Sequence, residues 1–96
     1  MNELKPAHAG TLESNDIMIT VAPGAKGSGI EIELESIVLA QYGQAIKQVI
    51  TSTLAEQNVI DIYIKAVDRG ALDCTIQART LTALARAGVI LQKELI

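Results

Sequence analysis

The chain has 96 residues, enough for one modest hydrophobic core but too few for that core and a deep active-site cleft, so we expect a single domain over residues 1–96. Hydrophobic residues make up 49% of the sequence and aromatic residues 2%, which predicts a core of aliphatic side chains. The net charge of −3 offers no basic surface to phosphate backbones, so we expect no nucleic-acid partner.

The ends and the cysteine content indicate a cellular location. Residues 1–10 contain Glu3, Lys5 and Pro6 and lack the apolar core of a signal peptide, and no apolar run has the length of a membrane span. Cys74 is the single cysteine, so no internal disulfide can form, which is typical of a reducing compartment. We therefore expect a cytoplasmic protein with no membrane partner.

The N-terminal third has the patterns of strands. Residues 7–13 have weak strand character and lead into Ser14-Asn15-Asp16, whose side chains favour a turn. Residues 17–23 then alternate isoleucine or valine with other residues, which predicts a strand with one buried face. These patterns place Ser14 at the tip of a hairpin.

A glycine-rich segment separates this strand from the next one. Residues 23–29 predict a flexible, exposed loop, and residues 30–35 alternate isoleucine or leucine with glutamate, which predicts a strand with one acidic face. Lys26-Gly27-Ser28 resembles part of a phosphate-binding loop. That loop needs four residues between its first glycine and the Gly-Lys pair, and a helix after it, whereas a strand follows here. A hairpin loop is the simpler interpretation.

A long amphipathic helix is predicted from Ile37 to about Asn58, because apolar residues recur there at spacings of three and four. Ser36 is the predicted N-cap and Asn58 the predicted stop. Gly43 lowers the helix propensity by about 1 kcal/mol relative to alanine, which indicates close packing at that position.

The C-terminal part predicts one more strand and one more helix. Residues 60–66 alternate again and end in the turn residues 68–70, and a helix follows from about Ala71 to Ala87, with Gly88 as its stop. The order is therefore strand, strand, strand, helix, strand, helix. It predicts an α+β fold with a mostly antiparallel sheet and two helices packed on one face.

The sequence offers few candidates for catalysis, which requires a nucleophile, a nearby base and usually a third group to orient the base. His8, the single histidine, lies in an N-terminal stretch that is expected to be mobile. Cys74 lies near the start of the last helix, where the helix dipole can lower a thiol pKa, but a small packing residue is the simpler interpretation. We therefore expect no catalytic residue.

The glutamates of residues 30–35 raise the possibility of a cation site. Glu31, Glu33 and Glu35 project from one face of a strand. Oxygen-ligand sites normally converge from loops, and consecutive side chains on one strand face are more often solvated. We therefore expect no metal.

Two serines are candidates for covalent attachment. Glu35-Ser36-Ile37 superficially resembles the Asp-Ser-Leu site of ordinary acyl carrier proteins, but those proteins are helical bundles, so a plain N-cap is the simpler interpretation of Ser36. Ser14 lies at an exposed turn that a modifying enzyme could reach. The physical argument alone leaves Ser14 as a turn residue.

A resemblance favours Ser14. Residues 9–16, with the sequence AGTLESND, and the strand 17–23 that follows resemble the signature of the citrate lyase acyl carrier protein family, the γ subunit of that complex. Residues 42–46 (YGQAI), 68–74 (DRGALDC) and 76–79 (IQAR) also resemble the corresponding parts of the family. The resemblance weakens in the glycine-rich loop and after Gly88.

This resemblance implies a non-catalytic carrier in which Ser14 is joined through a phosphodiester to 2′-(5″-phosphoribosyl)-3′-dephospho-coenzyme A. The thiol of that group would hold acetyl and citryl thioesters while citrate is cleaved to acetate and oxaloacetate. The implied partners are the acyltransferase (α) subunit, the acyl lyase (β) subunit and a prosthetic-group transferase. Asn15 replaces the glycine or serine that often follows the family's serine.

Other functions stay open. A carrier of citramalate lyase or malonate decarboxylase would use a similar arm, and a small ligand-binding or regulatory module would leave Ser14 unmodified and use the loop of residues 24–29 for recognition. We also consider that Arg69, Arg79 or Arg86 contacts the phosphates of the cofactor. Acidic residues near the arm would steer the carrier toward basic rims on its partners.

Overall fold

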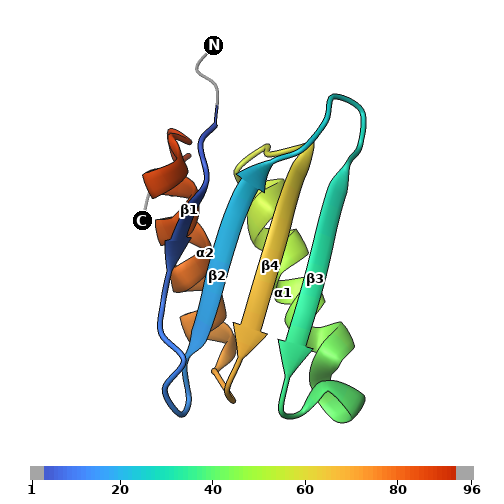
Figure 1. The fold of residues 1–96 in the computed structure, drawn as a ribbon, viewed down its shortest axis with the longest axis vertical. Helices are drawn as coiled ribbons and strands as arrows, with labels where there is room; N and C mark the ends of the chain where they lie inside the picture. Colours follow the sequence, from blue (N-terminus) through green and yellow to red (C-terminus); the bar gives the residue numbers. More distant parts are fainter. Residues whose placement is uncertain (1–3, 93–96) are drawn as a thin grey trace.

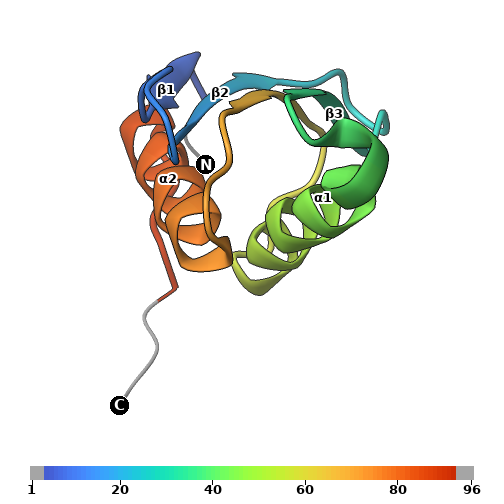
Figure 2. The ribbon, with the colours of Figure 1, turned by 90° about the horizontal axis from the view of Figure 1, so that it is seen from below.

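The computed structural model describes residues 4–92. The elements in chain order are β1 (Ala7–Ala9), β2 (Ile17–Pro23), β3 (Ile30–Ser36), α1 (Leu39–Glu56), β4 (Ile62–Asp68) and α2 (Asp73–Ala87). Figure 1 shows the sheet with its strands upright, and Figure 2 shows that both helices lie on the same face of it. The predicted order of elements and the α+β class are confirmed.

The four strands lie in the order β1-β2-β4-β3. β2 pairs antiparallel with both β1 and β4, whereas β3 and β4 are parallel, so the sheet is mixed. The parallel pair arises because α1 joins β3 to β4, and such a helical crossover returns the chain in the same direction. The hairpin predicted between residues 17–23 and 30–35 is wrong, since β4 lies between these two strands.

The connection from β2 to β3 is held by Asp61, which precedes β4. Its carboxylate accepts a hydrogen bond from the Gly29 N–H at 2.8 Å, and its carbonyl accepts one from the Gly24 N–H at 2.8 Å. Hydrogen bonds from the N–H groups of Gly27 and Gly29 lower the pKa of Asp61. Asp61 therefore fixes the glycine-rich loop at this end of the sheet.

The core lies between the sheet and the two helices. Alternate residues of β2 and β4 face inward, as their period-two pattern predicts. The fully buried large aliphatic side chains are Ile17, Ile19, Val21, Ile50, Leu54, Ile62, Ile64, Ile76 and Leu84. Burial of each such side chain stabilises the fold by about 1.5–3 kcal/mol.

Of the three residues predicted to begin or end a helix by capping it, two have the predicted role. Asn58 and Gly88, with φ of 56° and 109°, adopt the left-handed conformation that ends a helix, and both were the predicted stops. The predicted N-cap is wrong, because α1 begins at Leu39 and Ser36 lies at the end of β3. Neither helix of residues 4–92 combines the length and apolar character that a membrane span requires.

Three connections meet at the end of the sheet opposite the glycine-rich loop. The ladder pairs Ile17 with Asp68 and Ser36 with Asp68, so β2 begins where β3 and β4 end. In Figure 1 this end is at the bottom. The turn that contains Ser14 therefore lies at the same end of the sheet as the connections from β3 to α1 and from β4 to α2.

The turn after β1 gives a test of backbone packing. A Cβ atom added to Gly10 would lie 1.8 Å from the carbonyl oxygen of Ile17, and the φ of Gly10 is 98°, whereas nothing lies within 4 Å of a Cβ added to Gly27, whose φ is 82°. Gly10→Ala should lower the free energy of unfolding by about 2–4 kcal/mol, because both overlap and strain apply. Gly27→Ala, the matched control, should lose about 1 kcal/mol through strain alone. Equal losses in urea denaturation would contradict the predicted overlap at Gly10.

Candidate functional site

Ser14 lies in a tight turn at the tip of the β1–β2 hairpin, as predicted. The Asp16 N–H donates to the Glu13 carbonyl at 3.2 Å, which closes a turn around Ser14 and Asn15. Asn15 has a φ of 67°, a value that glycine and asparagine accept more readily than other residues. Ser14 itself is exposed. The positive φ at this position explains why asparagine is readily accommodated after Ser14.

Asp16 holds the base of this turn. Its carboxylate accepts hydrogen bonds from the Thr11 hydroxyl and from the Ile17 N–H, both at 2.7 Å. The Thr11 hydroxyl in turn accepts a bond from the Glu13 N–H at 3.2 Å. These bonds connect the two sides of the turn, so the backbone around Ser14 is held from both sides.

Arg79 of α2 anchors Asp16 to the helix layer. Its guanidinium donates from Nε to Oδ1 and from an Nη atom to Oδ2 of Asp16, both at 3.0 Å, in a bidentate ion pair. The Asp16 side chain is only 13% exposed and that of Arg79 is 39% exposed. The hydrogen bonds from Arg79 are the main cause that lowers the pKa of Asp16 from 3.8 to about 2.

Asp68 organises the neighbouring connection from inside the protein. Its carboxylate is 1% exposed and accepts hydrogen bonds from the Ser36 hydroxyl at 2.8 Å, the Gly70 N–H at 3.1 Å and the Ala71 N–H at 3.0 Å. These bonds compensate for the burial of the charge. Asp68 was predicted only as a turn residue, although the alternation of β4 continues to it and could have revealed it as buried.

The turn around Ser14 and the segment after β4 are joined directly. The Asn15 N–H donates to the Arg69 carbonyl at 2.8 Å, and the Arg69 N–H donates to the Asp16 carbonyl at 2.9 Å. The two stretches that carry the family resemblance, residues 9–16 and 68–74, are thus brought together. A sequence pattern alone gave no distance between them.

The competing serine has a different environment. Ser36 is half-buried, and its hydroxyl donates to Asp68 and accepts from the Val38 N–H at 3.1 Å.

The predicted mobility of the stretch that contains His8 is wrong, because His8 pairs with Thr20 in the β1–β2 ladder. β1 has only three residues, but it is held in place because it contacts α2 as well as β2.

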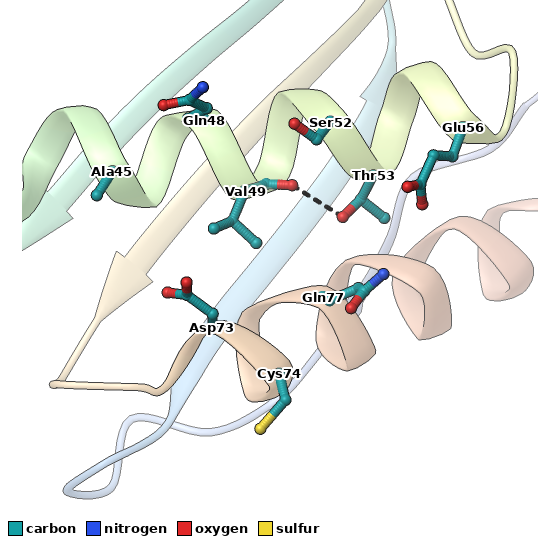
Figure 3. Close-up of a pocket in the computed structure, with 9 residues that line it drawn as sticks. All are labelled: Ala45, Gln48, Val49, Ser52, Thr53, Glu56, Asp73, Cys74 and Gln77. Atoms are coloured by element: carbon teal, nitrogen blue, oxygen red, sulfur yellow. Dashed lines mark hydrogen bonds between the residues drawn. The ribbon is translucent and has the colours of Figure 1, made fainter.

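Cys74 is exposed in the first turn of α2, so its interpretation as a small packing residue is wrong. The buried face of α2 runs through Ile76, and Cys74 lies off that face. Figure 3 shows its thiol at a polar groove between the helices, pointing away from α1. Gln48, Ser52 and Gln77 also line this groove.

The three glutamates of β3 are exposed on an edge strand. The Tyr63 hydroxyl of the adjacent β4 donates to the Glu33 carboxylate, which raises the pKa of Tyr63. Charged side chains on an edge strand oppose pairing with other chains. In the part of the chain that the structure describes, no group of three or more histidine, cysteine, aspartate or glutamate side chains is arranged to hold a metal ion.

Comparison with known proteins decides the family. The family model described as malonate decarboxylase delta subunit (MdcD) matches residues 4–87. A citrate lyase acyl carrier protein of Streptococcus uberis is 54% identical over 91% of this chain and 84% of its own length. Relatives of the same name from Lactiplantibacillus plantarum and Halothermothrix orenii are 54% and 53% identical, over 84% and 86% of the chain and 82% and 86% of their own lengths.

The chain belongs to the citrate lyase acyl carrier protein family. The predicted resemblance is therefore confirmed over nearly the whole chain. As a member of this family the chain is an acyl carrier rather than an enzyme. This role agrees with the site, in which the carboxylate of Asp16, two residues after Ser14, holds the turn.

The ion pair predicts a pH dependence of stability in this carrier. Asp16→Asn should lower the free energy of unfolding by about 1–2 kcal/mol at pH 7, a range reduced for the solvent exposure of Arg79. Because the folded pKa is depressed, the carboxylate's contribution is complete above 3.8 and is lost as the pH falls toward 2. Denaturation at a series of pH values measures the difference between the two proteins. A difference that stays constant down to pH 2 would contradict the assignment, and Arg79→Gln should behave as Asp16→Asn does.

Proposed function

We propose that the Ser14 hydroxyl joins this carrier, through a phosphodiester, to 2′-(5″-phosphoribosyl)-3′-dephospho-coenzyme A. The observation that supports this most directly is an exposed serine on a turn that is held by hydrogen bonds on both sides. An anchored turn positions the root of an arm, and an exposed hydroxyl is accessible to a transferase. The half-buried Ser36, bonded to Asp68, is a poorer acceptor.

When bound, the group supplies a thiol that holds the acetyl or citryl group as a thioester while citrate is cleaved to acetate and oxaloacetate. The residues of the chain supply position. Asp16 and Arg79 fix the turn against α2, and Asn15 fixes it against the segment after β4. The backbone of His8 pairs with Thr20 within the β1–β2 ladder and not at the tip of the hairpin, so we expect the transferase itself to provide the base that activates Ser14.

This proposal implies three protein partners in the cytoplasm. They are the acyltransferase (α) and acyl lyase (β) subunits of citrate lyase and the prosthetic-group transferase, and each must approach the Ser14 end of the sheet. Two of the arginines considered for cofactor phosphates are already engaged: Arg79 with Asp16, and Arg86 with the His8 carbonyl at 2.9 Å. Arg69, exposed beside the turn, is the better candidate.

A second candidate is the carrier of a malonate decarboxylase, which the description of the matching family model supports. A citramalate lyase carrier would use the same attachment. The alternative of an unmodified recognition module is less well supported, because the loop of residues 24–29 lies at the opposite end of the sheet from the turn shared with the family.

Intact-protein mass spectrometry with site mapping tests the attachment. The chain should be produced together with the citrate lyase subunits and the transferase, and the unaltered protein should gain the mass of phosphoribosyl-dephospho-coenzyme A on Ser14. Ser14→Ala should gain nothing, whereas Ser28→Ala, at another exposed loop serine, should be modified normally. An adduct on Ser36, or no adduct when the transferase modifies a known substrate, would overturn the proposal.

A further inference from the structure

An open cavity of about 450 Å³ lies between the first turns of α1 and α2, at the same end of the sheet as Ser14. The side chains that line it are mainly apolar, and they come from α1, α2 and the segment between β4 and α2. They include Val38, Ala45, Ile46, Leu72 and Ile76. A volume of this size is typical of sites for small organic groups.

The cavity adjoins the polar groove of Figure 3. The two hollows share Ala45 and Asp73, and the groove adds the amide side chains of Gln48 and Gln77. An extended group that entered the apolar cavity could therefore place its own amides against glutamine side chains. Negatively charged groups would be disfavoured, because Asp68 and Asp73 both line the cavity.

The wall of this cavity touches the turn that contains Ser14. Gly70 and Ala71 belong to the wall, and a Cβ atom added to Gly70 would lie 3.6 Å from Oδ1 of Asn15. The Asn15 N–H also donates to the carbonyl of Arg69, the residue before Gly70. A group anchored on Ser14 is therefore held beside the cavity.

Two large apolar side chains at the cavity are unusually exposed. Tyr42 is 55% exposed and Leu72 is 70% exposed, and both line the cavity. Exposed apolar surface around a hollow indicates a site that another group covers. The buried carboxylate of Asp68 already accepts hydrogen bonds from Ser36, Gly70 and Ala71, so its hydrogen bonds are made mainly within the chain.

We propose that this cavity binds the uncharged pantetheine end of the arm carried on Ser14, and so shelters its thiol between encounters with the partner subunits. The inference rests on the proposed function, since it needs an arm at Ser14. Pantetheine has a branched apolar segment, amide groups and a terminal thiol, which match an apolar cavity that continues into a groove whose lining includes the amides of Gln48 and Gln77. The phosphates of the arm remain outside, near the exposed Arg69. Tethering raises the effective concentration of the arm to the millimolar range, so weak intrinsic affinity is sufficient.

The first experiment needs no modified protein. Free pantetheine is titrated into the unmodified, ¹⁵N-labelled chain, and we expect chemical-shift changes in the cavity residues, chiefly Ala45, Ile46, Leu72 and Ile76. Ala45→Leu fills the cavity and should abolish these changes. Ala55→Leu is the matched control, because Ala55 is also an exposed alanine of α1 but lines neither hollow. Absent changes, or changes that persist in Ala45→Leu, would overturn the inference whatever happens at Ser14.

The second experiment uses the arm itself, in Cys74→Ser protein that site mapping has shown to be modified on Ser14. The arm then carries the only thiol. Its alkylation should be about threefold slower than that of free pantetheine, as expected for a tethered group that is bound for most of the time. Ala45→Leu should restore the free rate, and Ala55→Leu should not.

The outcomes separate the two proposals. An adduct on Ser14 whose thiol reacts at the free rate would contradict the sheltering cavity and leave the carrier function intact. If Ala45→Leu leaves that rate unchanged but prevents assembly with the lyase subunits, a partner side chain is the occupant and the inference is wrong. Lack of an adduct would overturn the attachment site, and the titration would still decide whether the cavity binds pantetheine.

Discussion

The bidentate ion pair between Asp16 and Arg79 is the contact on which the geometry of the Ser14 turn depends. It joins a hairpin tip, which is also held by the short strand β1 and by two backbone hydrogen bonds to Arg69, to a helix 63 positions further along the chain. Asp16 also accepts bonds from both sides of the turn, so a single carboxylate sets the backbone before and after Ser14. An exposed loop at a sheet edge would ordinarily be among the least stable regions of a domain. Here the loop has the support of a core element.

The buried Asp68 has the corresponding role in β4, the strand next to β2 in the sheet. Its carboxylate fixes the end of β3 through Ser36 and the start of the α2 connection through Gly70 and Ala71. Since Asn15 and Asp16 bond to Arg69, the next residue, the two acidic networks form one continuous support under the turn. Removing one partner from a buried carboxylate that accepts several hydrogen bonds is costly, whereas an exposed pair contributes little. The hydrogen bonds of the buried Asp68 therefore contribute more to the stability of this support than the partly exposed ion pair does.

Local patterns in the sequence predicted the elements well but not their neighbours in the sheet. The alternation in residues 17–23, 30–35 and 60–66 predicted three strands correctly, because half-buried strands impose that period on the chain. The position of β4 between β2 and β3 is a non-local property that neither strand's pattern contains. Ser14 was found by a turn pattern and a family resemblance. The ion pair from Arg79 and the burial of Asp68 depend on packing between distant segments, so no local pattern could place them.

The arrangement of the site fits a carrier better than an enzyme for a physical reason. A catalytic centre needs reactive groups that converge on one point, whereas the carboxylate of Asp16 is bonded to Thr11, Ile17 and Arg79 and holds the turn. The surface at this end includes the exposed Ser14 and an apolar hollow edged by Tyr42 and Leu72. A mobile arm requires a fixed root, because motion at the root would spread the reach of the thiol over a larger volume and lower its concentration at each partner. A carrier of this kind therefore needs both a rigid backbone at Ser14 and a flexible arm beyond it.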